Sequence, residues 1–307
     1  MTYKKNYILF LTVIASIVLI ITIYNNKANN IRLFPSKTVQ WEAPGGHYYS
    51  LVDQNGQIIL QTGLKVNPGD EFIDHHNMHY RVTSISGWNC STEAIEDVPA
   101  INTSSIVNWI GDHPALAETT PHVALYHTHS DESYTPTQGV PSQPGHGSIF
   151  QVGSALTDSL SKSGITVYHD FTPHDPHDTH AYMRSRRTAF RLLKLNPTAL
   201  FDIHRDSAPP EPYITYITGI ESAKVMIVVG RQNPRMAANI AFARQIKDKA
   251  DGIYPDLIRG IFIGQGNYNQ DLGPRALLFE IGTERLPEQM ALDAARCLGD
   301  VISSILK

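Results

Sequence analysis

The segment HVALYHTHSDES, residues 122–133, joins a short apolar run to a group of polar side chains. The run at 123–125 is typical of a buried strand, and His127 and His129 follow it directly. Two histidines one residue apart, just past a strand end, suit a metal ion, because neutral imidazole is the commonest metal ligand in proteins. Polar residues are also common where strands emerge from a sheet. The two histidines alone therefore do not distinguish a metal site from an ordinary strand end.

The same alternation of apolar runs and helical stretches continues to the C-terminus. Strands are predicted at 122–129, 165–170, 198–204, 223–230, 257–264 and 275–282, and helices at 147–164, 182–196, 234–252 and 286–306. Strands that alternate with helices of this length indicate an α/β domain at 121–307, with a central, mostly parallel sheet and flanking helices. No G-x-G-x-x-G or P-loop opens a helix, so nucleotide binding has no support.

A small β-rich module with a connector is predicted before this domain, at 46–120. Asn55-Gly56 stands between the runs YYSLVD and QIILQT, which is a strong hairpin signal. The run HYRVTSIS, from His79, alternates like a further strand. His75, His76 and His79 are interpreted as loop and strand-edge residues, because no matching set of acids and histidines surrounds them.

The first thirty residues predict a membrane anchor, followed by a linker at 31–45. Tyr7 to Tyr24 is almost wholly apolar and carries no charge, which is about the minimum span for a bilayer. Lys4 and Lys5 precede it, so the positive-inside rule keeps the N-terminus in the cytoplasm and the rest of the chain outside it. A cleaved signal peptide is the alternative.

Composition narrows the classes of function. The formal net charge is −4 and no basic stripe is present, so no nucleic-acid partner is expected. Eight of the 14 histidines fall between His122 and His180, which raises the expectation of a metal site. Cys90 and Cys297 are compatible with one disulfide outside the cytoplasm, but their spacing does not establish it.

Other strand ends also carry polar residues, in VYHD (167–170), FDIHRD (201–206) and LFEIG (278–282). Ligands of open α/β sheets gather outside the carboxyl ends of the strands, so His204 is a candidate metal ligand. Glu280 lies inside ALLFEIG, between apolar residues. A buried carboxylate is costly unless it is paired or bound to a metal, so it is either a general base or a partner for an arginine such as Arg275.

Metal-assisted hydrolysis is the chemistry that fits these residues. Zinc commonly takes three protein ligands, often histidine and glutamate, and keeps one position for water. It lowers the pKa of that water and polarises a carbonyl group. The chain lacks the G-x-S-x-G of serine hydrolases and the H-E-x-x-H of common zinc proteases.

Four motifs in the chain resemble the stage II sporulation protein P family. They are LYHTHSDESYTP, the GITVYHD segment with a following HD pair, FDIHRD and LLFEIG, in this order, over roughly residues 120–307. The resemblance implies a zinc-dependent N-acetylmuramoyl-L-alanine amidase, which cleaves the amide between muramic acid and the peptide stem of peptidoglycan. A second activity on cross-links has been ascribed to some members. The membrane anchor and a small preceding domain fit the same family.

The resemblance also implies roles for single residues. Glu280 matches the late glutamate that serves as catalytic base. His204 and His129 match zinc ligands, with His127 as the alternate for the latter. In the wider amidase group a glutamate opens the first helix, and counting back from Gly164 reaches His146 as the third ligand.

Glu132 is the rival of His146 for that third position, or else a residue that orients an imidazole. Arg205 and His169 are assigned to the substrate or to the orientation of the ligands. The expected cofactor is Zn²⁺. The expected partners are peptidoglycan, the membrane through the N-terminal helix, and a regulatory protein, since uncontrolled cleavage of the wall would be lethal.

Two other functions remain as alternatives. HTHSD also resembles the opening of metal-dependent phosphoesterases of the polymerase-and-histidinol-phosphatase type, although the anchor argues against that cytoplasmic class. The second alternative is a non-catalytic protein that binds the cell wall on an amidase scaffold. The presence of Glu280 and His204 argues against it.

Overall fold

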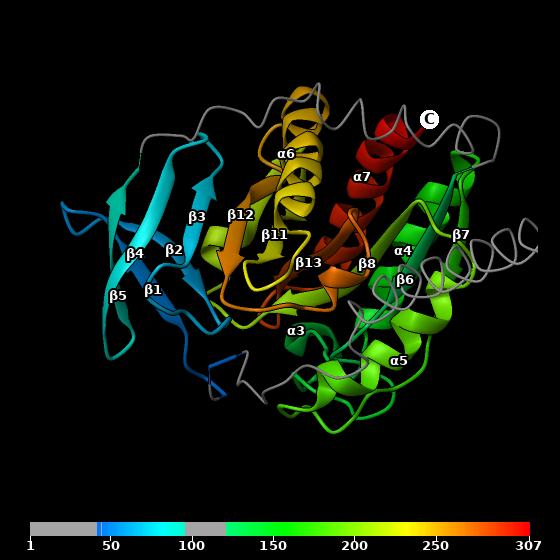
Figure 1. The fold of residues 1–307 in the computed structure, drawn as a ribbon, viewed down its shortest axis with the longest axis horizontal. Helices are drawn as coiled ribbons and strands as arrows, with labels where there is room; N and C mark the ends of the chain where they lie inside the picture. Colours follow the sequence, from blue (N-terminus) through cyan, green and yellow to red (C-terminus); the bar gives the residue numbers. More distant parts are fainter. Residues whose placement is uncertain (1–41, 44, 96–120) are drawn as a thin grey trace, which may run out of the picture. The chain divides into compact units, whose positions relative to one another are not determined.

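An eleven-stranded mixed sheet is the framework of the protein (Figure 1). The computed structural model describes residues 42–43, 45–95 and 121–307. The strands follow one another across the sheet in the order β2-β1-β5-β4-β3-β12-β11-β13-β8-β6-β7. The predicted membrane anchor at Tyr7–Tyr24 lies outside the described residues. Within those residues, no helix is long and apolar enough to cross a membrane.

The α/β part holds six strands of the sheet. They are β6 (His122–Tyr126), β7 (Thr166–His169), β8 (Ala199–Asp206), β11 (Val225–Gly230), β12 (Ile258–Gly264) and β13 (Ala276–Thr283). Four of the pairings between them are parallel, and only β11 with β13 is antiparallel. The predicted α/β architecture is confirmed, but "mostly parallel" describes these six strands and not the whole sheet.

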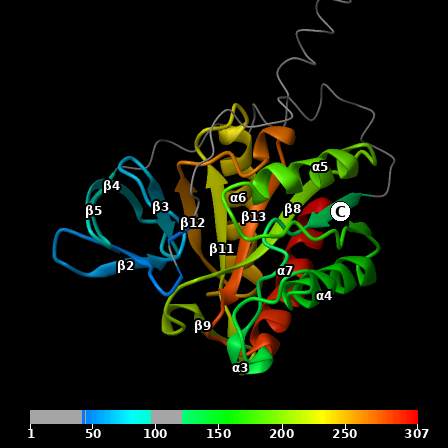
Figure 2. The ribbon, with the colours of Figure 1, turned by 90° about the horizontal axis from the view of Figure 1, so that it is seen from below.

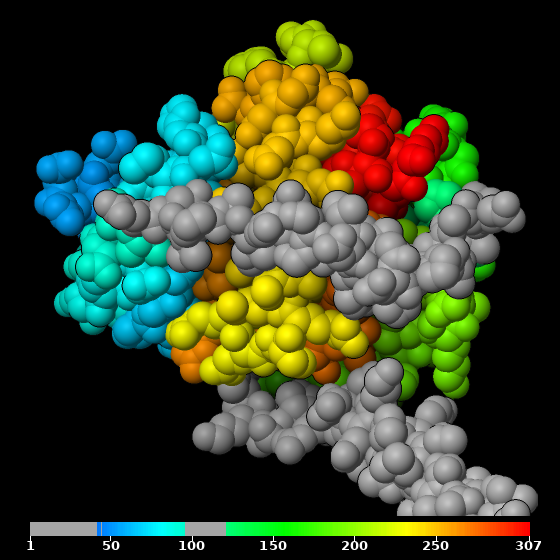
Figure 3. All heavy atoms as spheres, turned by 45° about the horizontal axis from the view of Figure 1, so that its top comes forward, coloured from blue at the N-terminus to red at the C-terminus, as the bar shows by residue number. Residues whose placement is uncertain are grey.

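Helices flank this part of the sheet. They are α3 (Thr135–Gln138), α4 (Ile149–Lys162), α5 (Ala181–Leu193), α6 (Met236–Ile253) and α7 (Glu288–Leu306), with the short 3₁₀ helices η2 (Glu211–Tyr213) and η3 (Gln270–Leu272). Helix α7 packs against both α4 and α6. Figure 2 shows α4 and α7 side by side, and Figure 3 shows α6 and α7, in gold and red, adjoining on one face.

The β-rich part contributes the other five strands: β1 (Tyr49–Val52), β2 (Ile58–Thr62), β3 (Glu71–Asp74), β4 (His79–Ser86) and β5 (Asn89–Ala94). The predicted hairpin is present, since β1 and β2 pair antiparallel across Asn55-Gly56. Gly56 has φ +79°, a conformation that glycine adopts without steric cost. This part does not form a separate sheet, because β3 pairs antiparallel with β12.

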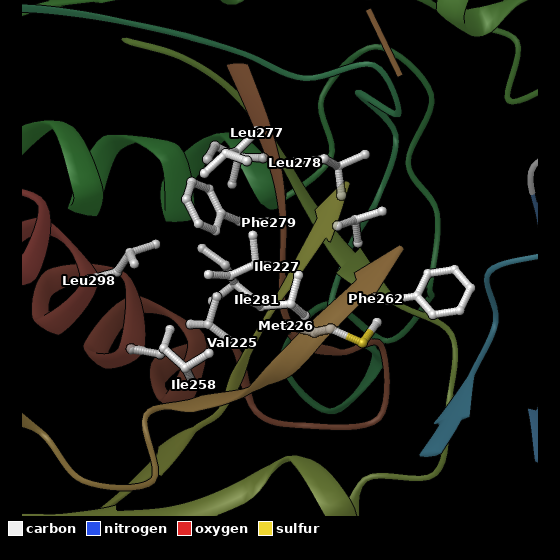
Figure 4. Close-up of a cluster of buried hydrophobic side chains, with 14 of the residues drawn as sticks. Val225, Met226, Ile227, Ile258, Phe262, Leu277, Leu278, Phe279, Ile281 and Leu298 are labelled. Carbon is white, nitrogen blue, oxygen red and sulfur yellow. The ribbon is translucent and has the colours of Figure 1, made fainter. Parts of the chain in front are cut away.

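The core lies around the central strands. Every residue of β8, β11, β12 and β13 is buried. Strands that are covered on both faces read as continuous apolar runs, which explains why they were recognisable in the sequence. Figure 4 shows Val225, Ile227 and Phe279 from these strands packed together, with Leu298 of α7 beside them.

The two cysteines are not paired. Cys90 lies buried on β5, Cys297 lies on α7, and both are free. The short hairpin of β9 (Ile214–Ile217) and β10 (Ile220–Ala223), which the sequence did not predict, forms a second, two-stranded sheet.

Candidate metal centre

Three neighbouring strands bring the predicted residues to one edge of the sheet. Strand β8 lies between β13 and β6. Glu280 of β13 stands directly opposite His204 of β8, and Tyr126, the last residue of β6, stands opposite Asp202. The segment that follows β6 therefore emerges beside the end of β8, as expected for a ligand site in an α/β sheet.

His129, Glu132 and His204 form a buried group that could hold a metal ion. Oε1 of Glu132 lies 3.5 Å from Nδ1 of His129 and 3.6 Å from Nδ1 of His204. All three side chains are at most 3% exposed. Two imidazole nitrogens and one carboxylate oxygen that converge in this way are a ligand set typical of zinc.

The backbone around Glu132 holds its carboxylate in place. The Arg205 N–H donates to Oε2 of Glu132 at 3.0 Å, and the Ile149 N–H at the start of α4 donates to the Glu132 carbonyl at 3.0 Å. Burial alone would raise the pKa of Glu132, but His204 and Arg205 outweigh it and lower the pKa. Glu132 therefore carries a negative charge at neutral pH, as a metal ligand requires.

The Asp202 carboxylate lies on the other side of the His204 ring. Oδ1 of Asp202 lies 2.9 Å from Nε2 of His204, which leaves Nδ1 directed at Glu132. The same Oδ1 accepts a hydrogen bond of 2.8 Å from the Thr128 N–H. A carboxylate behind an imidazole is the usual support of a metal-binding histidine, because it sets the tautomer and the orientation of the ring.

Two buried oxygens test whether these residues fit a cation. Oε1 of Glu132 and Oε2 of Glu280 have no hydrogen-bond partner among the described residues. Buried polar atoms in native proteins are nearly always satisfied. A metal ion bound by Glu132 and the two histidines would satisfy the first oxygen. The donor set and the unsatisfied oxygen therefore fit a zinc ion.

Glu280 is buried beside His204. Burial raises the pKa of Glu280 well above its usual value, although His204 acts in the opposite direction. A carboxyl group with a raised pKa holds a transferred proton more readily than an ordinary one, which suits a group that accepts a proton and then returns it. Arg275, the alternative partner considered for Glu280, lies instead over the ring of Phe242, 5.4 Å from its centroid.

A second group, which the sequence did not reveal, adjoins the first. Glu42, His129 and His177 also lie close enough together to hold a metal ion. Oε1 of Glu42 lies 2.7 Å from Nδ1 of His129, and Oε2 lies 2.9 Å from Nε2 of His177. Glu42 falls in the predicted linker, where no pattern marks it, and in the sequence His177 is only one of the clustered histidines.

Two other predicted ligands do not join either group. His146 is exposed on a loop, and its Nδ1 lies 2.9 Å from the carbonyl oxygen of Pro144. His127 lies beside Nε2 of His169, at 2.8 Å, and the carbonyl oxygen of Ile203, at 3.0 Å. The chain bends after β6, and the rings of His127 and His129 have different partners, His169 for the first and Glu132 for the second. Of the alternates, the structure brings Glu132 to the site.

His169 and Arg205 take different positions. Burial lowers the pKa of His169 to about 4, and its ring contacts His127 rather than the metal-binding groups. The Arg205 side chain donates to the carbonyl oxygens of Ser133, at 3.3 Å, and Pro141, at 2.9 Å. Arg205 thus supports the loop after β6 as well as Glu132.

A cavity of about 860 Å³ opens onto this centre. Its lining includes His129 of the first group, Glu42 and His177 of the second, and Arg205 and Glu284. This volume is within the range of sites for small molecules. The centre is therefore accessible to a ligand from one side.

Comparison with known proteins supports the resemblance seen in the sequence. The model of the stage II sporulation protein P (SpoIIP) family matches residues 74–303. The chain belongs to the SpoIIP family. The match contains His129, Glu132, His204 and Glu280, whereas Glu42 lies outside it.

A curated SpoIIP relative is known from Bacillus subtilis (strain 168). Stage II sporulation protein P of that organism is 28% identical over 202 residues, which cover 60% of this chain and 50% of the relative. The chain thus aligns with about half the length of the curated relative it matches.

Solved amidase structures are similar to this SpoIIP chain at a lower level. N-acetylmuramyl-L-alanine amidase Ami1 from Mycobacterium smegmatis is 16% identical, with a TM-score of 0.40, over 61% of this chain and 96% of Ami1. The catalytic domain of CwlV from Bacillus (Paenibacillus) polymyxa var. colistinus is 16% identical, with a TM-score of 0.38, over 61% of this chain and 98% of the CwlV domain.

Proposed function

We propose that this protein is a zinc-dependent peptidoglycan amidase, which hydrolyses the bond between N-acetylmuramic acid and L-alanine. The observation that supports this most is the buried group of His129, Glu132 and His204 with Glu280 beside it. Membership of the SpoIIP family and the adjoining cavity are consistent with it.

His129, Glu132 and His204 would hold the zinc ion. Glu132 takes the place for which His146 was first predicted. When bound, zinc supplies a water of lowered pKa and polarises the carbonyl group of the amide. Asp202 lies against His204, and the Arg205 N–H donates to Glu132, so both residues support the orientation of the proposed ligands.

Glu280 would be the proton carrier of the reaction. Its unpartnered Oε2 accepts a proton from the attacking water. The water oxygen bonds to the carbonyl carbon, the C–N bond breaks, and the same proton passes to the nitrogen of alanine. The products are a carboxylate on the muramic acid and a free amino group on the peptide stem.

The expected location follows from the N-terminal segment. An anchor at Tyr7–Tyr24, with Lys4 and Lys5 on its cytoplasmic side, would place residues beyond about 30 outside the cytoplasm. Peptidoglycan lies on that side of the membrane. We therefore propose a single-pass membrane enzyme that acts on the adjacent wall, under the control of a regulatory protein partner.

A digestion of purified peptidoglycan by residues 30–307 tests this function. Zinc-loaded protein should release free peptide stems and leave bare glycan strands, as identified by mass spectrometry. A chelator should abolish the release, and added zinc should restore it. Glu280→Gln is the matched control: it should keep zinc but lose hydrolysis by about 10²–10⁴-fold. Full activity in that variant, or cleavage of a phosphoester in place of the amide, would contradict the proposal.

A further inference from the structure

One oxygen of the Glu42 carboxylate faces His129 of the metal centre, and the other faces His177. Oε1 lies 2.7 Å from Nδ1 of His129, and Oε2 lies 2.9 Å from Nε2 of His177. Glu42 belongs to a short segment outside the α/β part, joined to the β-rich part by one β-bridge to Leu64. It is thus a carboxylate brought to the cavity by a different region of the chain.

The two potential metal groups meet at one atom. Nδ1 of His129 faces Oε1 of Glu42 at 2.7 Å and Oε1 of Glu132 at 3.5 Å. One imidazole nitrogen offers one lone pair and so serves one cation. The groups therefore form one site rather than two. Glu42 lies on the side of this site that faces the cavity, where a substrate must enter.

His177 is held in place without the help of Glu42. Its Nδ1 lies 3.1 Å from Oδ1 of Asp131, whose Oδ2 accepts a hydrogen bond of 2.5 Å from Ser142. The ring of His177 also stacks on that of His129, with centroids 3.8 Å apart and planes at 25°. Carboxylate oxygens of Asp131 and Glu42 thus face Nδ1 and Nε2 of His177, and both ring nitrogens donate to them in the imidazolium form.

We propose that His177 is a substrate-binding residue whose Nε2–H donates to the carbonyl oxygen of the scissile amide. In the free protein the Glu42 carboxylate occupies the place of that oxygen, so it acts as an internal competitor of the substrate. This inference rests on the proposed amidase function. Cleavage turns the amide carbonyl into a carboxylate, the same planar group that Glu42 carries. Negative charge develops on the carbonyl oxygen as water adds, so a fixed donor there binds more strongly in the transition state than in the substrate.

The proposal requires opposite effects from the two residues. Removal of Glu42 frees the donor and the open side of the centre, so carboxylates should bind more tightly. Removal of His177 takes away the donor, so they should bind more weakly, whether or not Glu42 is present. A merely structural role of the pair would weaken binding in both cases.

Calorimetry with N-acetylmuramic acid, a carboxylate like the expected product, measures these effects on zinc-loaded protein. Glu42→Ala should bind it about tenfold more tightly than the native chain. His177→Ala in the Glu42→Ala background should lose about 10–100-fold, the worth of a hydrogen bond to a charged group. Metal analysis should show unchanged zinc in each variant. His180→Ala, at an exposed histidine on the same loop, is the matched control and should bind as the native chain does.

Kinetics on peptidoglycan give a second readout. His177→Ala, which removes the donor completely, should lower kcat by about 10²–10³-fold and should change KM far less. Unchanged carboxylate binding in Glu42→Ala, or an effect of His177 on KM alone, would overturn the inference. If the variants bind N-acetylmuramic acid as expected but no form cleaves peptidoglycan, the amidase function fails while the carboxylate site stands.

Discussion

Glu280 is a buried acid whose charge opposes folding when no metal is bound. Burial raises the pKa of Glu280 well above its usual value, and its Oε2 has no hydrogen bond among the described residues. A carboxyl group with a higher pKa in the folded state takes up a proton on folding. It therefore favours folding below its unfolded pKa of about 4.3, and this contribution is lost as the pH rises through the folded pKa.

Glu280→Gln should therefore stabilise the metal-free protein at neutral pH. The expected gain is about 1–3 kcal/mol, the cost of a buried group that lacks its partner. The gain should shrink as the pH falls toward about 4, because the carboxyl group then becomes largely protonated in the unfolded state as well. Thermal unfolding of chelated protein between pH 4 and pH 8 measures this difference. If the stability difference between Glu280→Gln and the native chain does not change with pH, Glu280 is neutral or hydrogen-bonded over the whole pH range.

The choice between Glu132 and His146 as ligand is also a question for single residues. Glu132→Gln keeps the shape and the acceptor for the Arg205 N–H but removes the charge, so it should weaken zinc binding by about 100-fold or more. His146→Ala should leave zinc affinity within about twofold, because His146 is exposed and outside both groups. Competition with a chromophoric chelator measures both. A comparable loss in His146→Ala would restore the ligand set first predicted.

Sequence reasoning placed some of these residues better than others, for physical reasons. His204 and Glu280 interrupt apolar strands, where a polar residue is costly and so conspicuous. Glu42 approaches from a polar segment that carries no periodic pattern. The position of His146 was counted from Gly164 along the helix, but α4 begins only at Ile149, and the turn before it carries His146 into solvent.

The start of helix α4 packs against the backbone turn that carries Glu132. A Cβ atom on Gly147 would lie 2.4 Å from the carbonyl oxygen of Glu132 and 2.5 Å from the carbonyl carbon of Asp131. These are backbone atoms, which yield less readily than the end of a side chain. The close approach lets the Gly147 N–H donate to Ser130 at 3.0 Å and so ties the helix to the turn that presents Glu132.

Gly147→Ala should therefore weaken the metal centre without altering any ligand. We expect a loss of about 1–3 kcal/mol in the free energy of unfolding, as for other overpacked sites, together with a lower zinc affinity. Gly252→Ala in α6 is the control, because nothing lies within 4 Å of the added Cβ. Chelator competition and thermal unfolding report the two quantities. Native zinc affinity in Gly147→Ala would mean that the turn adapts independently of the helix.

At the level of elements, the long periodic segments were predictable and the short polar ones were not. Helices α4, α6 and α7 bury one face each, which imposes a regular apolar spacing on the sequence. Strand β5, NCSTEA, is mostly exposed, and β3 has only four residues. Their strand conformation is stabilised by pairing with β4 and β12 rather than by a pattern of their own.

In the molecule as a whole, the β-rich part contacts β8, the strand that carries the proposed zinc ligand His204. Asp206 ends β8, two residues after His204. Its Oδ1 accepts hydrogen bonds from the Gly63 N–H at 2.7 Å and from Thr62 at 3.1 Å, and its Oδ2 accepts one of 2.8 Å from Tyr213. The pairing of β3 with β12 continues this connection through the sheet. The contacts of Asp206 with Thr62 and Gly63 join residues more than a hundred positions apart, so no local pattern predicts them.

Gly63→Ala tests whether this connection reaches the centre. A Cβ atom there would lie 2.7 Å from both Cβ and the carbonyl oxygen of Ser207, so it must push the chain after Asp206 away from the β-rich part. Displacement of the end of β8 should disturb His204 as well. We therefore expect a lower midpoint of thermal unfolding and a several-fold weaker zinc affinity.

Gly273→Ala provides the comparison, because its added Cβ would meet only the Cβ of Ala276, at an ordinary 3.9 Å. It should change neither quantity appreciably. A Gly63→Ala protein that is less stable but binds zinc as the native chain does would show that the β-rich part only supports the fold. A loss of both would mean that whatever binds the β-rich part can act on the metal centre through β8, because a coupling between two sites works in both directions.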